Sequence, residues 1–244
     1  MNQSKKILLI LGASSDLGCE LIRKEIANFD LIIGHYNHIN DALKELKDLY
    51  TDKLELMQAD FSDINSINDF ISQIKSKEID PTHIVHFAAP KFRYTRYEQT
   101  CIEEFQKEMQ TSLYSLICIT QAFIPSMKKR HYGKIIVMLS ICTRGVPPKF
   151  LSSYVVSKYA LLGLVKSLSS DYSDKGIQVN AVSPEMIDTK FLDNIPDFVK
   201  QQSADSSPLK RNLTVTDVIP TFEFLLSDSS NSITGENFCI TGGK

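Results

Sequence analysis

The sequence predicts an α/β domain built on a doubly wound parallel β-sheet with helices on both faces. Apolar runs of strand length alternate with amphipathic segments of helical length from residue 7 to residue 241. The first apolar run leads through a glycine turn, residues 12–18, directly into a helix. No linker, repeat or low-complexity tract interrupts the alternation, so residues 1–244 are expected to form a single domain.

The strands are predicted from short apolar runs, of which the first is ILLIL. Because helical segments separate the strands, the sheet is expected to be parallel and joined by right-handed crossovers. The predicted strands cover residues 7–11, 31–34, 54–59, 84–89, 133–140, 177–182 and 237–241.

The helices are predicted from apolar residues at helical spacing. In the first, Leu17, Leu21, Ile22 and Ile26 share one face. The longest pattern runs continuously over residues 102–127 and is expected to end near Pro125, because proline interrupts a helix. The remaining helices are predicted over residues 41–49, 64–74, 152–171, 193–202 and 215–226.

The composition is that of an ordinary globular protein, with 43% hydrophobic residues, 23% charged residues and a net charge of −2. A net charge this close to zero does not indicate binding to nucleic acid or to an anionic membrane. No apolar run reaches the roughly 18 residues of a membrane helix. The five cysteines lack Cys-x-x-Cys spacing, and the histidines lack metal-ligand spacing. We therefore expect free thiols, no metal site and a cytoplasmic location.

Candidate binding residues gather at one edge of the predicted sheet. Parallel α/β sheets bind ligands outside the carboxyl ends of their strands. The glycine turn, Asp60, Ala88, Ser140 and Pro184 all lie at or just beyond such ends. The turn permits close backbone approach, and the helix N-terminus after it offers unpaired N–H groups to a phosphate.

Tyr154 and Lys158 are the residues best suited to proton transfer. They stand four residues apart on a predicted helix, so their side chains share one face. An ammonium close to a phenol favours phenolate and lowers the tyrosine pKa towards working pH. Ser140, at the end of the preceding strand, can reach the same place through the intervening loop. Together they form a candidate acid/base site for an alcohol or carbonyl oxygen.

In these motifs, and in their order and spacing, the chain resembles the short-chain dehydrogenase/reductase family, closest in look to the 3-oxoacyl-[acyl-carrier-protein] reductases. The matching stretches are LGASSDLG, the turn at Asp60, GKIIVMLS, YVVSKYALLGLVKSL, IQVNAVSPEMIDT and SITGENFCITGG. The resemblance implies a seven-stranded Rossmann-type sheet and a homo-oligomer, either a dimer or a tetramer. It also implies a reaction that interconverts a ketone and a secondary alcohol with a nicotinamide cofactor.

The resemblance further implies a role for each site residue. Tyr154 would be the catalytic acid/base, Lys158 would lower its pKa and hold the nicotinamide ribose, and Ser140 would orient the substrate oxygen. Ser112 stands where the family has a helix asparagine whose backbone carbonyl serves a proton relay, which is kept if the helix has a local kink. The expected cofactor-binding residues are Gly12, Ser14, Ser15, Asp16, Leu17, Gly18, His35, Asn37, Asp60, Phe61, Ala88, Ala89, Tyr154, Lys158, Pro184, Ile187 and Thr189.

Several positions depart from the family pattern. Leu11 replaces the threonine before the glycine turn, and Asp16 replaces the middle glycine. We expect the Asp16 carboxylate to face away from the pyrophosphate and to cap the helix. The Asn-Asn-Ala-Gly motif reads HFAA, beginning at His86, and Glu185 replaces a glycine near the nicotinamide. These changes leave open weak nucleotide binding or slow turnover.

The end of the second predicted strand indicates which cofactor is used. NAD-dependent members carry a carboxylate there to bind the ribose 2′-OH. Residues 34–38, GHYNH, contain none, although Ser15 stands where many NADP-dependent members have arginine. We predict NADP(H), with NAD as the alternative.

Two basic segments suggest an anionic or carrier-linked substrate. Residues 90–98, PKFRYTRYE, mix cations and aromatic residues beside the expected cleft, and a solvated loop is the simpler alternative. Lys128, Lys129, Arg130 and Lys175 lie where acyl-carrier-protein reductases bind their acidic partner, but basic residues also suit a helix C-terminus. Residues 188–213 resemble the substrate lid of the family.

The leading prediction is therefore an NADP(H)-dependent reductase of a ketone, such as a 3-oxoacyl thioester. A sugar or polyketide-tailoring dehydrogenase is the alternative within the enzyme class. A catalytically weak nucleotide-binding scaffold or regulatory protein is the alternative from another class. Because Ser140, Tyr154 and Lys158 are all present, the enzyme is favoured.

Overall fold

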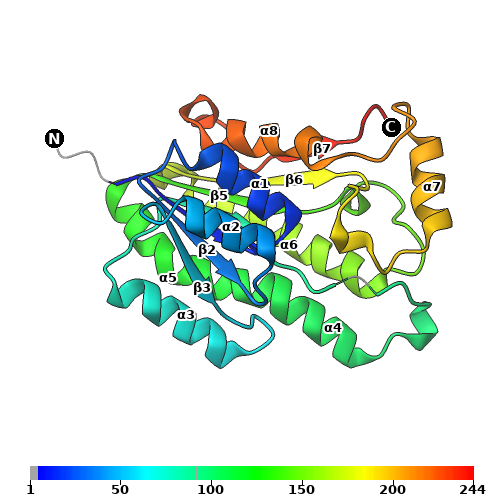
Figure 1. Cartoon of the computed structure of the whole chain (residues 1–244), viewed down its shortest axis with the longest axis horizontal. Helices are drawn as coiled ribbons and strands as arrows, with labels where there is room; N and C mark the ends of the chain where they lie inside the picture. Colours follow the sequence, from blue (N-terminus) through cyan, green and yellow to red (C-terminus); the bar gives the residue numbers. More distant parts are fainter. Residues whose placement is uncertain (1–4, 92) are drawn as a thin grey trace.

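The chain folds around a parallel β-sheet that is covered by helices on both faces (Figure 1). The structure is a computed structural model, and it describes residues 5–91 and 93–244. The sheet in this part of the chain has seven strands in the order β3-β2-β1-β4-β5-β6-β7, which confirms the predicted architecture. The strands are β1 (Ile7–Leu11), β2 (Leu31–Tyr36), β3 (Leu54–Gln58), β4 (His83–His86), β5 (Gly133–Met138), β6 (Ile177–Pro184) and β7 (Asn237–Ile240).

Two apolar layers enclose the sheet. On one face α1, α2 and α8 pack against the strands, and α3, α5 and α6 cover the other. Leu8 and Ile10 of β1 belong to the first layer and Leu9 to the second, because successive strand residues point to opposite faces. The helices are α1 (Asp16–Glu25), α2 (Asp41–Leu49), α3 (Ile64–Ser76), α4 (Ile102–Glu108), α5 (Ser115–Arg130), α6 (Ser152–Tyr172), α7 (Asp197–Ser206) and α8 (Val215–Leu226).

The strand order reverses beside β1, and this reversal determines where a ligand can bind. β1 pairs with β2 on one side and with β4 on the other, with Leu11 in register with both His35 and His86. In sheets of this kind the crevice outside the carboxyl ends of the strands at the reversal is the ligand site. None of the described helices is long and apolar enough to cross a membrane.

The structure corrects the continuous helix predicted over residues 102–127. α4 and α5 are separated by a π-helical segment, Met109–Tyr114. Pro125 does not end α5 but lies inside it on an exposed position, while its neighbours Phe123, Ile124 and Met127 are buried. Burial of this face stabilises the helix past the proline and offsets the hydrogen bond that the proline cannot make.

Three other boundaries that differ from the prediction bear on the site. β4 ends at His86 and β5 at Met138, so the alanines after β4 and Ser140 after β5 lie in loops. α7 begins at Asp197 instead of residue 193, because Lys190–Leu192 forms a 3₁₀ turn and Pro196 holds an extended backbone just before the helix.

Candidate active site

Ser140, Tyr154 and Lys158 come together at the carboxyl edge of the sheet, between β5 and α6. Ser140 caps a short 3₁₀ turn, in which the backbone N–H of Cys142 donates to its Oγ at 3.3 Å. Tyr154 and Lys158 are buried in the first turns of α6, and the Tyr154 side chain is hydrogen-bonded to that of Ser140. The three residues predicted to act on an oxygen atom are therefore neighbours.

Lys158 does not act on the Tyr154 hydroxyl in the expected way. Its ammonium donates to the carbonyl of Met138 at 2.8 Å and lies 5.5 Å from the centroid of the Tyr154 ring. Burial raises the pKa of Tyr154, and the hydrogen bond with Ser140 opposes this effect. The predicted lowering of the tyrosine pKa is wrong for this structure, because burial dominates and the hydrogen bond with Ser140 offsets it only in part. Tyr154 is a neutral phenol here, which is the form that donates a proton.

Ser112 lies in the π segment between α4 and α5, so the local irregularity expected there is present. In a π-helix each N–H bonds to the carbonyl five residues back, as Ser115 does to Gln110. The Ser112 side chain is fully buried, and its Oγ has no hydrogen-bond partner within residues 5–91 and 93–244. The condition of a local helix irregularity at Ser112 is met, and the relay through its backbone carbonyl stays a prediction.

The glycine turn is held tightly at the N-terminus of α1. Gly12 has a φ of +89°, and a Cβ on Gly18 would lie 2.6 Å from the carbonyl oxygen of Gly12. Ser15 is the N-cap of α1: its Oγ accepts from the Gly18 N–H at 3.0 Å and donates to the Gly12 carbonyl at 2.8 Å. The side-chain amide of Asn40 donates to the carbonyl of Ser14 at 2.6 Å. The residues at this turn fit a diphosphate, which binds at helix N-termini.

The buried side chain of His35 holds the backbone of the glycine turn through a hydrogen bond with Gly12. Its ring is 3% exposed and is stacked on Phe61 with centroids 3.6 Å apart. Nε2 lies 3.1 Å from the Ala59 carbonyl and must carry the proton, so Nδ1 accepts the hydrogen bond of the Gly12 N–H at 3.1 Å. Burial lowers the pKa of His35 to about 4. The expected contact of the His35 and Phe61 side chains with a cofactor is corrected, because both are enclosed in the core.

Asn37 and Asp60 are the polar residues of this region that remain open to a ligand. Asp60 is exposed and Asn37 partly so, and the Asn37 amide donates to Asp60 Oδ1 at 3.4 Å. The hydrogen bonds of the Ser62 hydroxyl and N–H lower the pKa of Asp60. An ionised Asp60 beside an amide fits hydrogen bonding to the adenosine part of a dinucleotide.

Asp16 is not the cap of α1, because Ser15 fills that role. Instead Asp16 Oδ2 accepts from the backbone N–H of Lys190 at 2.9 Å, and so connects the glycine turn to the predicted lid. The nearby Thr189 hydroxyl donates to the carbonyl of Ile187 at 3.4 Å. The prediction of a capping role was wrong, since the carboxylate is directed to the lid backbone.

The other predicted cofactor contacts lie at the same edge of the sheet. The loop after β4 lies against the turn, because a Cβ on Gly12 would be 3.0 Å from the backbone nitrogen of Ala88, and Ala89 is partly exposed. Pro184 is buried at the end of β6, and the next residue, Glu185, pairs with Lys244 at 3.8 Å. The side chains of Leu17 and Ile187 are mostly buried.

The sequence interpretation missed Glu108, the last residue of α4. Its side chain is 6% exposed, and the Oγ of Ser157 on α6 lies 3.5 Å from its Oε2. Burial raises the pKa of Glu108 to about 7, against the opposing effect of Lys158. A signal was available, because Phe105, Glu108, Met109 and Ser112 follow the spacing of a core-facing helix stripe, where a carboxylate is unusual.

An apolar wall lies against Tyr154. Cys142, Tyr154, Leu192 and Ile195 form a buried cluster to which residues 188–213 contribute the two aliphatic members. Partly buried apolar side chains extend this wall, namely Tyr94, Leu151, Val155, Met186, Phe191 and Val199. The segment predicted as a lid therefore covers the acid/base residue with apolar side chains.

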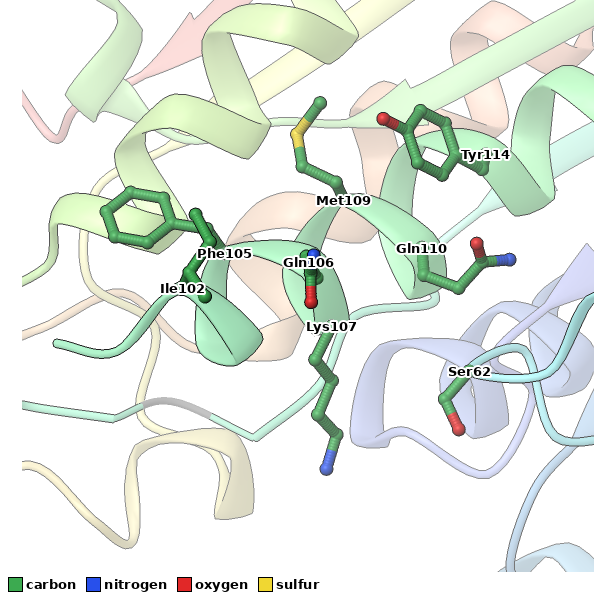
Figure 2. Close-up of a pocket in the computed structure, with 8 residues that line it drawn as sticks. All are labelled: Ser62, Ile102, Phe105, Gln106, Lys107, Met109, Gln110 and Tyr114. Carbon is green, nitrogen blue, oxygen red and sulfur yellow. The ribbon is translucent and has the colours of Figure 1, made fainter.

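A separate groove of about 580 Å³ lies on the outer side of α4 (Figure 2). Its walls come from α4, the π segment and the loop after β3. None of its residues belongs to the predicted catalytic set, so we do not place the substrate there. The lining residues are Ser62, Ile102, Phe105, Gln106, Lys107, Met109, Gln110 and Tyr114.

Some cations of the two basic segments already have partners within the chain. Arg93 pairs with Glu104 at 2.6 Å, and Phe92 lies outside the described residues. Arg130 forms an ion pair with Asp80 and donates to the carbonyl oxygens of Pro81 and Tyr132, whereas Lys128 and Lys129 are exposed. Arg130 is thus part of the fold of this corner and is not available to an acidic partner.

The comparison with protein families assigns the chain. Residues 27–244 match the family model described as "Enoyl-(Acyl carrier protein) reductase". With the sheet order and the catalytic residues described above, the chain belongs to the short-chain dehydrogenase/reductase family. It is an oxidoreductase of the class that interconverts alcohol and carbonyl groups.

Curated relatives are similar along their full length but have diverse names. Oxidoreductase UcpA of Salmonella typhimurium is 28% identical over 98% of this chain and 94% of its own length. A 3alpha-hydroxysteroid dehydrogenase of Mediterraneibacter gnavus is 28% identical over 99% and 98%. The 3-oxoacyl-[acyl-carrier-protein] reductase FabG of Buchnera aphidicola is 27% identical over 100% and 98%.

Solved structures share the fold at lower identity. "ElxO with NADP Bound" superposes with a TM-score of 0.84 at 24% identity, covering 98% of each chain. "4-hydroxyisoleucine dehydrogenase complexed with NADH and succinate" gives a TM-score of 0.86 at 24% identity, covering 97% of this chain and 98% of the other. Both likenesses concern the fold alone.

Proposed function

We propose that this protein reduces a ketone on a largely apolar molecule to a secondary alcohol, using NADPH, and that a 3-oxoacyl thioester represents the substrate class. The observation that carries the proposal is the neutral Tyr154 phenol, hydrogen-bonded to Ser140 and packed against the apolar wall. A buried phenol that donates a proton suits the reductive direction. The wall favours an acyl or steroid-like body over a sugar, because a sugar would leave its hydroxyl groups unpaired there.

The proposed roles follow from position. Bound NADPH supplies the hydride. Tyr154 donates the proton to the carbonyl oxygen, Ser140 orients that oxygen, and Lys158 provides a positive charge beside the phenol. The glycine turn, Asn37, Asp60 and the backbone around Thr189 are proposed to bind the cofactor. The absence of a carboxylate on residues 34–38 supports NADP over NAD, since a 2′-phosphate would meet no like charge from them.

The alternative functions are tested by the same cofactor-binding and turnover experiment. We propose a homo-oligomer because of the family resemblance, and a cytoplasmic location remains a prediction. The scaffold reading is disfavoured by the assembly of Ser140, Tyr154 and Lys158, which a binding protein has no physical need to keep.

The test is cofactor binding followed by turnover. Purified protein is titrated with NADPH and NADH by fluorescence and thermal shift, and reduction of acetoacetyl-CoA, a 3-ketosteroid and a keto-sugar is then monitored at 340 nm. We expect tighter binding of NADPH and turnover of the apolar ketones. Tyr154→Phe should lower kcat by at least about 100-fold and leave the NADPH Kd unchanged. Binding of neither nucleotide would refute the proposal, and binding without turnover of any carbonyl would favour the scaffold.

A further inference from the structure

Glu108 is a buried carboxyl group placed directly behind the catalytic helix. α4 and α6 pack together, and Glu108 on α4 is 6% exposed. In the described part of the chain, the hydroxyl of Ser157, the residue that precedes Lys158, lies 3.5 Å from Glu108 Oε2. A carboxyl group at such a position costs folding free energy unless its charge is balanced or its proton is retained.

Lys158 is the cation whose charge acts most strongly on this carboxyl group, and it lies on the helix against which α4 packs. The lysine is 4% exposed, and its ammonium donates to one carbonyl, that of Met138. Burial lowers the pKa of Lys158 to about 8, and the negative charge of Glu108 opposes this effect more than any other group does. Among the described residues the two do not form a contact ion pair, so they interact through space in a region from which water is excluded. At low local dielectric such an interaction stays strong.

We propose that Glu108 is a positioning residue that acts through Lys158: its carboxylate is the counter-charge that keeps the lysine protonated at its buried position. This inference rests on the proposed function, in which the lysine charge lies beside the reacting phenol. It assigns to α4 a polar role in addition to the backbone relay expected at Ser112.

The hydrogen bonds around Glu108 support both of its protonation states. The Ser157 hydroxyl lies 2.8 Å from the Tyr154 carbonyl, to which it can donate. When it does, its lone pairs face Glu108, and a protonated carboxyl can donate to them. When Glu108 is ionised, Lys158 balances the charge. The Glu108 side chain therefore has a partner in either protonation state, but only its ionised form balances the charge of Lys158.

The surrounding ionisable groups do not provide a substitute counter-charge for Lys158. Lys107 on the same helix favours ionisation of Glu108, and Tyr154 is neutral. Cys142 lies near the lysine, but burial raises the pKa of its thiol, which stays neutral at pH 7. His86 at the end of β4 is also neutral, because burial and Lys158 lower its pKa to about 3. Glu108 is the anionic group in this set.

The experiment measures the lysine directly. The full-length protein is labelled with ¹⁵N-lysine, the Lys158 side-chain signal is assigned by its loss in Lys158→Arg, and its titration is followed by NMR. In Glu108→Gln, which keeps the shape of the side chain, we expect the Lys158 midpoint to fall by roughly one pH unit. Glu108→Asp should restore part of the shift. Glu103→Gln, an exposed change on the same helix, should leave the midpoint where it is.

Turnover gives the second readout. The pH profile of kcat for NADPH and acetoacetyl-CoA should move to lower pH in Glu108→Gln by the same interval, and should not move in Glu103→Gln. An unchanged Lys158 midpoint in Glu108→Gln overturns the inference, even if that variant is slower or less stable. If the wild-type protein reduces no carbonyl probe, the proposed function fails separately, and the NMR titration still decides the role of Glu108.

Discussion

His35→Phe tests whether a buried histidine supports the cofactor turn. Phenylalanine keeps a flat ring for stacking on Phe61 but removes the acceptor for the Gly12 N–H and the donor to the Ala59 carbonyl. Each buried backbone group left unpaired costs about 1–3 kcal/mol. We therefore expect the free energy of unfolding at pH 7 to fall by about 2–4 kcal/mol, and NADPH to bind more weakly because the turn is no longer held.

The pH dependence distinguishes this mechanism from a simple packing defect. Burial of the ring lowers the pKa of His35 from its ordinary value of 6.5 to about 4 in the folded protein. Between these values the unfolded chain binds the proton and the folded protein does not, so stability is lost as pH falls below 6.5. From pH 7 to pH 5 the wild-type protein should lose about 2 kcal/mol through His35, at 1.36 kcal/mol per pKa unit.

Phenylalanine cannot titrate, so His35→Phe does not lose this stability as pH falls. The difference in the free energy of unfolding between wild type and His35→Phe should therefore be about 2 kcal/mol smaller at pH 5 than at pH 7. His83 and His86 contribute equally to both proteins. Urea unfolding at pH 7, 6 and 5 measures the gap, with exposed His38→Phe as the matched control, for which no gap is expected. A gap that stays constant with pH would show that His35 does not titrate as its burial requires, and the reasoning would be refuted.

Two further changes test neighbouring parts of the molecule. Asp16→Asn keeps an oxygen acceptor for the lid backbone but removes a negative charge near the expected diphosphate. NADPH should bind about fivefold more tightly by titration, an effect of about 1 kcal/mol that added salt reduces; equal or weaker binding at low salt would contradict this. Arg130→Glu should lower the free energy of urea unfolding by about 2 kcal/mol, since it breaks the contacts with Asp80 and Pro81. Exposed Lys129→Glu should change it little, and equal effects of the two would disprove the structural role of Arg130.

The sheet and its ligand edge could be predicted from local patterns. A continuous apolar run, ILLIL, identifies β1, because a strand buried on both faces carries no polar alternation. The glycine turn is readable because Gly12 needs a positive φ and Gly18 has no room for a Cβ. These are constraints that a few consecutive residues impose, and so they appear in the sequence.

Long-range packing decides the features that the sequence did not reveal. The π segment is placed by contacts of α4, α5 and α6, and Pro125 is tolerated because its helix is held by the core. His35 looked like a ligand contact because it ends a strand at the correct edge, yet its ring fills the space beneath the turn. The stripe on α4 indicates that Glu108 is buried, but its position behind the catalytic helix follows only from the packing of α6 against α4.

Two of the departures from the family pattern, both carboxylates, have a local partner in this chain. The Asp16 carboxylate accepts from the Lys190 backbone, and Glu185 is paired with Lys244. Ser112 lies in a π segment that keeps an irregular backbone. A site that had lost its function would have no reason to pair both carboxylates beside the ligand edge of the sheet. Because these two pairs lie next to the glycine turn, the lid and the end of β6, they favour a working oxidoreductase over a scaffold that only retains the fold.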